Sequence, residues 1–132
     1  MDLPGGAPAP DVSPDPVDLG RALAAMDGDR EILADVVAVF LEDCPGRLAA
    51  LTAAVEHGSL VEAAEVAHAL KGALGAVGAH GAHGEAVELE RLARAGDLTG
   101  LRAAAGSFAA LVERALAFLA ARDLRHTRDW VG

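Results

Sequence analysis

The residues of this 132-residue chain that could do chemistry are mainly its five histidines, because it has one cysteine and no tyrosine. His68 stands three positions before Lys71 in an alanine-rich stretch. An imidazole has an unperturbed pKa of about 6.5, so at neutral pH it is largely uncharged and offers a lone pair as a nucleophile. Lys71, one helical turn away, could fold its ammonium over the ring and neutralise a group attached there. The pair is suited to reversible phosphoryl transfer.

The stretch around His68 has the spacing of an amphipathic helix that begins near Ser59 and stops at Gly78. Apolar residues recur at steps of three and four: Leu60, Ala63, Ala67, Leu70, Leu74 and Val77. At about 100° per residue, His68 projects roughly 130° away from the centre of this face, so its side chain should be exposed. Residues one or two turns away should form a strip on its side, namely Ala64, Lys71, Gly72 and Gly75.

Gly72 and Gly75 weaken this predicted helix, because glycine inside a helix costs about 1 kcal/mol relative to alanine. We expect function to compensate for the loss, since a bare strip beside the imidazole lets the surface of another protein reach the ring. Glu65 lies close enough to His68 to form part of the rim of such a docking surface. A hydrogen bond could orient the ring, but the sequence does not identify its partner.

Three further stretches are predicted to be long helices from the same periodicity. The first carries an apolar stripe from Leu33 to Val55 after an Asp29 N-cap, and it should bend at Pro45. The second is weaker, over about 82–95, and follows a glycine-rich turn at 78–84; the third covers 98–119. Because four amphipathic helices can bury their stripes only against one another, we predict an all-α fold, an antiparallel up-down-up-down four-helix bundle. A short extra N-terminal helix is expected over 17–26.

The length of the chain favours one domain with one core. Residues 1–16 carry five of the six prolines and show no periodicity, so they are predicted to be a disordered tail. The bundle is placed at residues 17–122, and residues 123–132 are expected to be a polar, loosely held C-terminal tail.

Composition argues against several classes of partner. With 20 acidic residues against 11 basic ones, the net charge is −9, which would repel nucleic acid and anionic membranes. No signal sequence is found, and no apolar run approaches the roughly 18 residues of a membrane span. Cys44 cannot form an internal disulfide, and its place in the core stripe favours a small hydrophobe over a reactive thiol. We therefore expect a cytoplasmic monomer.

The sequence HALKG at residues 68–72, with Gly-Ala at 78–79, resembles the signature of histidine-containing phosphotransfer (HPt) domains, H-x-L-K-G followed five residues later by G-A. Residues 40–45 (FLEDCP) resemble the family's F-L-x-x-x-P segment, and Leu89-Glu90 with 95–98 (AGDL) resemble its L-E…x-G-D-L segment. The resemblance covers roughly residues 17–122. The chain departs from many members at Ala73 and Ala76, where polar side chains that could orient phosphate are common.

The resemblance implies a phosphocarrier in a two-component phosphorelay, with no independent catalytic activity. Phosphohistidine would form at His68 from a phosphoaspartate on a response-regulator receiver domain and pass to a second receiver, with a sensor (hybrid) histidine kinase as a further partner. Lys71 would stabilise the phosphoryl charge. The receiver would dock on a surface formed by Ala64, Glu65, Gly72 and Gly75. No cofactor or metal is expected on this chain, because Mg²⁺ would belong to the receiver.

Two alternatives remain. A non-catalytic helical adaptor or kinase-docking regulatory protein would keep the bundle and would not need His68. A metal site could be imagined from His68, His80 and His83, but the last two fall in the predicted glycine-rich turn with no cysteine and one nearby acid, Glu85. The sequence therefore favours no metal site.

Overall fold

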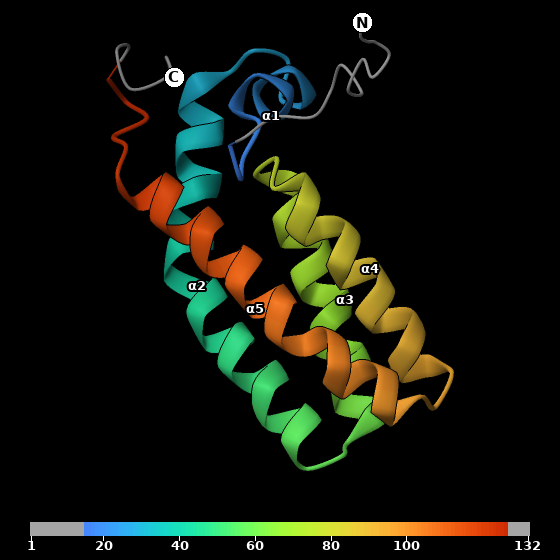
Figure 1. Cartoon of the computed structure of the whole chain (residues 1–132). Coiled ribbons are helices and arrows are strands. Elements are labelled where there is room, and N and C mark those ends of the chain that lie inside the picture. Colours follow the sequence, from blue (N-terminus) through green and yellow to red (C-terminus); the bar gives the residue numbers. More distant parts are fainter. Residues whose placement is uncertain (1–14, 127–132) are drawn as a thin grey trace, which may run out of the picture.

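A computed structural model describes residues 15–126, and every regular element in that range is an α-helix. The elements are α1 (Leu19–Ala25), α2 (Arg30–Glu56), α3 (Leu60–Ala76), α4 (His80–Arg94) and α5 (Leu98–Ala120). Figure 1 shows α2 to α5 side by side in an antiparallel bundle, while α1 lies across the end at which α2 begins. The predicted all-α four-helix bundle with a short N-terminal helix is confirmed.

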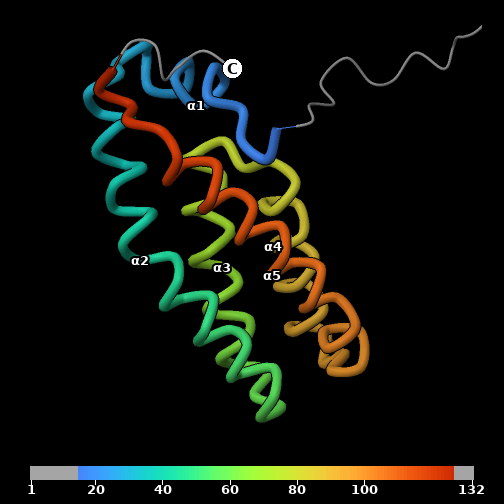
Figure 2. The backbone as a smooth tube through the Cα atoms, turned by 60° about the vertical axis from the view of Figure 1, so that its left-hand side comes forward, coloured from blue at the N-terminus to red at the C-terminus, as the bar shows by residue number. Residues whose placement is uncertain are grey.

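Local sequence signals define the ends of these helices. Aspartate side chains accept hydrogen bonds from backbone N–H groups in the first turns of α1, α2 and α5, which satisfies donors that the helix leaves unpaired. The three caps are Asp18, Asp29 and Asp97, with distances of 3.0, 3.1 and 2.8 Å. Glycines with positive φ follow α2, α3 and α4, at positions 58, 78 and 96. These turns are short and bring consecutive helices back antiparallel, as the tube in Figure 2 shows.

The core is built from the stripes that the periodicity identified. Its largest fully buried side chains come from all four long helices: Phe108, Leu33, Leu51, Leu70, Leu74, Leu89, Leu101 and Leu119. No charged or polar residue in the described range is buried. The bundle therefore contributes a dry, apolar support, and its polar chemistry lies at the surface.

The beginning of α4 differs from the prediction. The helix starts at His80, two residues earlier than expected, and it includes Gly81 and Gly84 within the segment interpreted as a turn. Gly78 alone makes the turn, with φ of +80°, and its carbonyl accepts a hydrogen bond from Asp18 N at 2.9 Å. Burial of Ala82 and Ala86 against the core stabilises the first turns, so tertiary packing outweighs the poor helix propensity of the glycines.

The C-terminal segment also differs where it is described. Leu124 is buried, and the Arg125 guanidinium donates to Asp35 of α2 at 2.6 Å, so residues 123–126 are not loosely held. Most of the two predicted tails, residues 1–14 and 127–132, lies outside the described residues. Helix α2 continues through Pro45 as one element, and the bend expected there stays a prediction.

By length and composition alone, α5 would also be apolar enough to cross a membrane, with a hydropathy of 1.5. The helix contains few charged residues, and its many alanines raise its mean hydropathy. The large side chains Leu101, Phe108, Val112 and Leu119 are buried in the bundle. The core helix of a soluble bundle passes the same test.

Candidate functional site

His68 lies in the middle of α3, and its side chain is 63% exposed. It is the exposed, mid-helix imidazole that the helical periodicity predicts. The ring is placed by the buried neighbours on the opposite face of α3, Ala67 and Leu70, both 0% exposed. The backbone beneath the ring is therefore fixed by the core, while the ring itself is open to another molecule.

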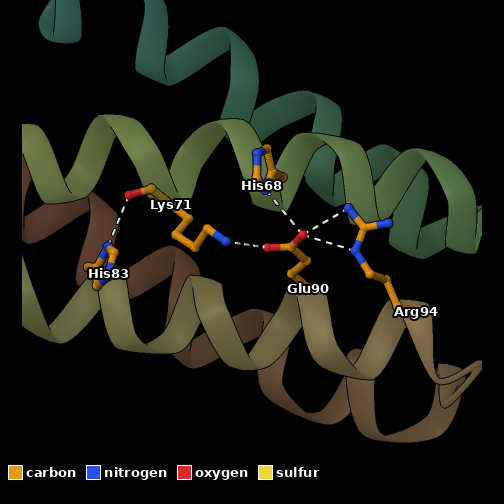
Figure 3. A network of polar contacts seen from close by, with 5 residues as sticks. All are labelled: His68, Lys71, His83, Glu90 and Arg94. Carbon is orange, nitrogen blue, oxygen red and sulfur yellow. Dashed lines mark hydrogen bonds and ion pairs between the residues drawn. The ribbon is translucent and has the colours of Figure 1, made fainter.

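The ring is oriented from the neighbouring helix by a carboxylate, as Figure 3 shows. Glu90 of α4 lies against α3 with its side chain 13% exposed, and its Oε2 is 3.1 Å from His68 Nδ1. The same carboxylate accepts hydrogen bonds from Lys71 Nζ at 2.8 Å and from Arg94 Nε at 2.9 Å, and Arg94 Nη2 forms an ion pair with it at 2.8 Å. One carboxylate thus joins the histidine to two cations.

The protonation of Glu90 determines which nitrogen of His68 is reactive. The hydrogen bond from Lys71, followed by that from Arg94, lowers the pKa of Glu90 from 4.5 to about 2, so the group is ionised at neutral pH. An ionised carboxylate can only accept hydrogen bonds, so Nδ1 of His68 must carry the proton. In the neutral ring, the lone pair is then on Nε2, the nitrogen that Glu90 does not contact.

The residues predicted to form one strip divide between two sides of α3. Ala64 is 4% exposed, so its expected place on the docking surface is wrong. Lys71 reaches α4 through Glu90, and a Cβ atom on Gly75 would lie 3.2 Å from His83 Nδ1 of α4. Helix α4 therefore covers this side of the strip, because its axis packs along α3 on that side of His68.

The other side of the strip is open. Gly72 has nothing within 4 Å of the position that a Cβ atom would occupy, so only here does the missing side chain leave free space beside His68. Glu65 and Ala76 are also exposed on this side, and Glu65 makes no described contact with His68. Gly75 is exposed as well, although His83 lies beside it, so its place on the docking surface stays a prediction.

The geometry agrees with the comparison of the sequence with known families. A family model for the Hpt domain matches residues 35–121, which is more than half of the chain and includes α3, α4 and their polar network. The chain belongs to the Hpt domain family. No curated protein and no solved structure gave a match to this chain. The part of the chain that matches the family model thus includes His68 and the residues that surround it.

A groove lies beside the open face of the Hpt domain, between α2 and α3. It has a volume of about 370 Å³ and is lined by apolar side chains with acidic and basic residues at its edge: Asp35, Val36, Val39, Phe40, Asp43, Cys44, Arg47, Ala73 and Ala76. Val39 is 57% exposed. Cys44 is buried in the core, in agreement with its interpretation as a small hydrophobe, and burial raises the pKa of its thiol to about 11.

Two other histidines of the Hpt domain, His57 and His83, make side-chain contacts with backbone carbonyls. His80 and His83 are in the first turn of α4, not in a loop, and no group of three or more potential metal ligands occurs among residues 15–126. His83 Nδ1 lies 3.0 Å from the backbone carbonyl of Lys71. His57 is the C-cap of α2, and its Nδ1 lies 2.8 Å from Ala53 O.

Glu90 and Arg94 are the polar neighbours of His68 that residue spacing did not identify. Their spacing of four residues places them on one face of a helix, and the buried Leu89 and Ala93 precede each of them by one position. Polar residues that border an apolar stripe lie at the edge of a helix–helix contact. The antiparallel pairing of α3 and α4 would have pointed to Glu90, but the register of that pairing is not readable from either helix alone.

Proposed function

We propose that this Hpt domain relays a phosphoryl group between response-regulator receiver domains through a phosphohistidine at His68. One observation carries the proposal: an ionised carboxylate holds the proton on Nδ1, and the opposite nitrogen of an exposed imidazole is left with its lone pair. A histidine that only made the surface soluble would not need a carboxylate acceptor such as Glu90, which also binds two cations.

The transfer step follows from this arrangement. The Nε2 lone pair attacks the phosphorus of an aspartyl phosphate, an N–P bond forms, and the P–O bond to the aspartate breaks with the electron pair leaving on its carboxylate. The product ring carries a proton on Nδ1 and phosphorus on Nε2, so it is a cation. Glu90, at 3.1 Å from Nδ1, stabilises that positive charge as it develops. Reversal of the same step onto a second receiver completes the relay.

Lys71 and Arg94 supply positive charge for the phosphoryl oxygens. Their side chains are 29% and 58% exposed, so both can shift from Glu90 toward a dianion on His68 without opening the core. Charge-assisted hydrogen bonds of this kind are stronger than neutral ones. In this proposal Mg²⁺ belongs to the receiver, and the chain itself acts as a phosphocarrier without an independent catalytic activity.

The receiver is proposed to approach across Gly72 and to place an apolar surface in the groove between α2 and α3. Ala73 and Ala76 line that groove and lie on α3 one and two turns beyond His68, so the groove and the histidine share this helix. Such a contact would bury Val39, one of the few large apolar side chains exposed in the described range. A sensor kinase could dock in the same way, and the domain is proposed to act as a cytoplasmic monomer.

Incubation with a panel of receiver domains phosphorylated with ³²P tests this function. The protein should take up label that is lost in acid and retained in base, and His68→Gln should abolish it. His80→Gln is the matched control, because His80 is exposed at the start of α4 and has no described contact with Glu90. Label that persists in His68→Gln would move the phosphorylation site elsewhere.

The groove also favours a second candidate, a helical adaptor or kinase-docking regulatory protein, because its apolar lining does not depend on His68. An adaptor would bind a receiver or kinase with the same affinity in the wild type and in His68→Gln. It would take no label from any receiver. Binding and labelling measured on the same two proteins separate the candidates.

A further inference from the structure

We propose that His83 is a positioning residue for the phosphoryl site: it enters the space left by Gly75 and holds the backbone of Lys71 against α4, beside His68. The inference rests on the proposed function for its effect on transfer. Its structural part, the interlocking of His83 with Gly75, can be tested without any receiver.

The contact between His83 and α3 has a defined direction. His83 Nδ1 lies 3.0 Å from the carbonyl oxygen of Lys71, and the ring is partly buried between the two helices (Figure 3). A carbonyl oxygen can only accept, so Nδ1 must carry a proton and donate it. The bond adds to the hydrogen bonds within α3 and ties the two helices together at Lys71.

Lys71 is thereby held at both of its ends by α4. His83 binds its backbone carbonyl, and Glu90 binds its ammonium at 2.8 Å. The two residues are seven positions apart on α4, which is a rise of about 10 Å along one face of the helix. The Lys71 side chain lies between them, so its ammonium is directed along α4 to the carboxylate that also binds His68.

Gly75 is the reason that the ring of His83 fits. A Cβ atom at this position would lie 3.2 Å from Nδ1 and 3.4 Å from Cε1 of His83, closer than a side chain and a ring normally approach. Glycine is less favourable than alanine inside a helix, so its use here needs a compensating contact. Gly72 on the same helix has nothing within 4 Å of a Cβ position. Of these two glycines, only Gly75 is therefore explained by a contact within the molecule, the one with the His83 ring.

The proposal predicts that the effect of Gly75→Ala depends on the residue at position 83. Gly75→Ala alone should displace the His83 ring and slow phosphoryl transfer to His68 about five-fold, the equivalent of one lost hydrogen bond. In the His83→Ala background, the same substitution should leave the remaining transfer rate unchanged. There it should also raise the folding equilibrium constant about five-fold, because alanine then brings only its better helix propensity.

The tautomer of His83 gives a readout that general destabilisation would not change. Two-bond ¹H–¹⁵N spectra should show the proton on Nδ1 of His83 in the wild type, and Gly75→Ala should remove that signature. Gly84→Ala is the matched control, because Gly84 is the next residue on α4 and has nothing within 4 Å of a Cβ position. It should leave the His83 signals as they are.

Conservative replacement separates positioning from packing. Asparagine places an amide nitrogen at the same point along the side chain as Nδ1, so His83→Asn should keep most of the transfer rate that His83→Ala loses. The loss in His83→Ala should also disappear in a Lys71→Gln background, since the effect acts through Lys71. A wild-type rate in His83→Ala, or an equal loss in both backgrounds, would overturn the positioning role.

The failure of this inference is distinguishable from failure of the proposed function. If the wild type takes no label from any receiver, the relay is refuted, while the spectra and the Gly75–His83 stability coupling still decide the contact. If the wild type is labelled and Gly75→Ala is additive with His83→Ala in both rate and stability, the relay stands and the inference about His83 is wrong.

Discussion

Replacing Glu90 with glutamine removes the charge that organises the site and keeps the size of the side chain. The carboxylate accepts three hydrogen bonds, from His68 Nδ1, Lys71 Nζ and Arg94 Nε, and it forms an ion pair with Arg94 Nη2. A glutamine has one acceptor oxygen, and its NH₂ group would face either Lys71 or the side shared by His68 and Arg94. His68 then loses the preference for a proton on Nδ1, and part of the population carries the proton on Nε2, where it blocks the nucleophile.

The size of this effect can be worked from the exposure of the ring. A hydrogen bond to a charged group contributes about 1.5–3 kcal/mol, and water competes for it because the His68 side chain is 63% exposed. We therefore take about 1 kcal/mol for the tautomer preference, which is about five-fold in the ratio of the two tautomers. Loss of the charge that stabilises the cationic product ring adds to this. Together they should slow phosphoryl transfer to His68 by about ten-fold, or 1.4 kcal/mol.

Rapid-quench measurement of transfer from a ³²P-labelled receiver gives the rate, and two-bond ¹H–¹⁵N spectra of His68 give the tautomer. Glu88→Gln is the matched control: Glu88 is on the same helix and carries the same charge, but its carboxylate pairs with Arg91 at 2.8 Å. Equal rates in the two variants would refute the assignment of Glu90. So would a slowed rate in Glu90→Gln with an unchanged Nδ1–H tautomer, since the reasoning places the defect in that proton.

Four further outcomes are expected. Gly72→Arg should block transfer while stabilising α3 by about 0.5–1 kcal/mol, whereas Gly106→Arg, at an equally open position in α5, should leave transfer unchanged; equal transfer in both would refute docking across Gly72. Lys71→Gln should lower the transfer rate about ten-fold, measured in the same quench assay. The pKa of Glu90 is about 2 in the folded state against a usual 4.5, so its contribution to stability is present above pH ~4.5 and lost as the pH falls toward 2. The free energy of unfolding in urea should therefore depend less on acid pH in Glu90→Gln than in the wild type, and identical profiles would contradict this. Cys44 should react with a thiol reagent only at the rate of unfolding, as followed by absorbance, because its thiol is buried and its pKa is about 11.

Most of the fold could be predicted from the sequence because each helix carries its own evidence. Steps of three and four define the buried stripes, and aspartates and glycines at the ends define their limits. The exception is the start of α4, where glycine content outweighed a weak stripe in the prediction. The burial of Ala82 and the His83 contact with α3 stabilise this turn from outside, and neither can be seen in the sequence of 78–84.

The exposed histidine of the site was predictable for the same reason, and its environment was not. The exposure of His68 depends only on the helix that carries it, so the angle between its side chain and the apolar face of that helix was sufficient to predict the exposure. The surroundings of Ala64 and Gly75 depend on the packing around α3: Ala64 is buried, and the His83 ring of α4 lies beside Gly75. A strip drawn on one helix shows which residues share a side, but not which of them another helix will cover.

The packing of the neighbouring helices gives a structural role to two alanines that follow the His68 motif. Ala73 and Ala76 cannot orient a phosphoryl group or a water molecule, and on the sequence alone that role has no occupant. In the structure both line the apolar groove between α2 and α3, where a polar side chain would reduce the surface available to a docking protein. Orientation of the imidazole comes instead from Glu90 on the opposite flank of His68. In the proposed function the two neighbouring helices therefore differ in role: Glu90 on α4 sets the proton and the charge at His68, and the groove beside α2 offers an apolar surface to the partner.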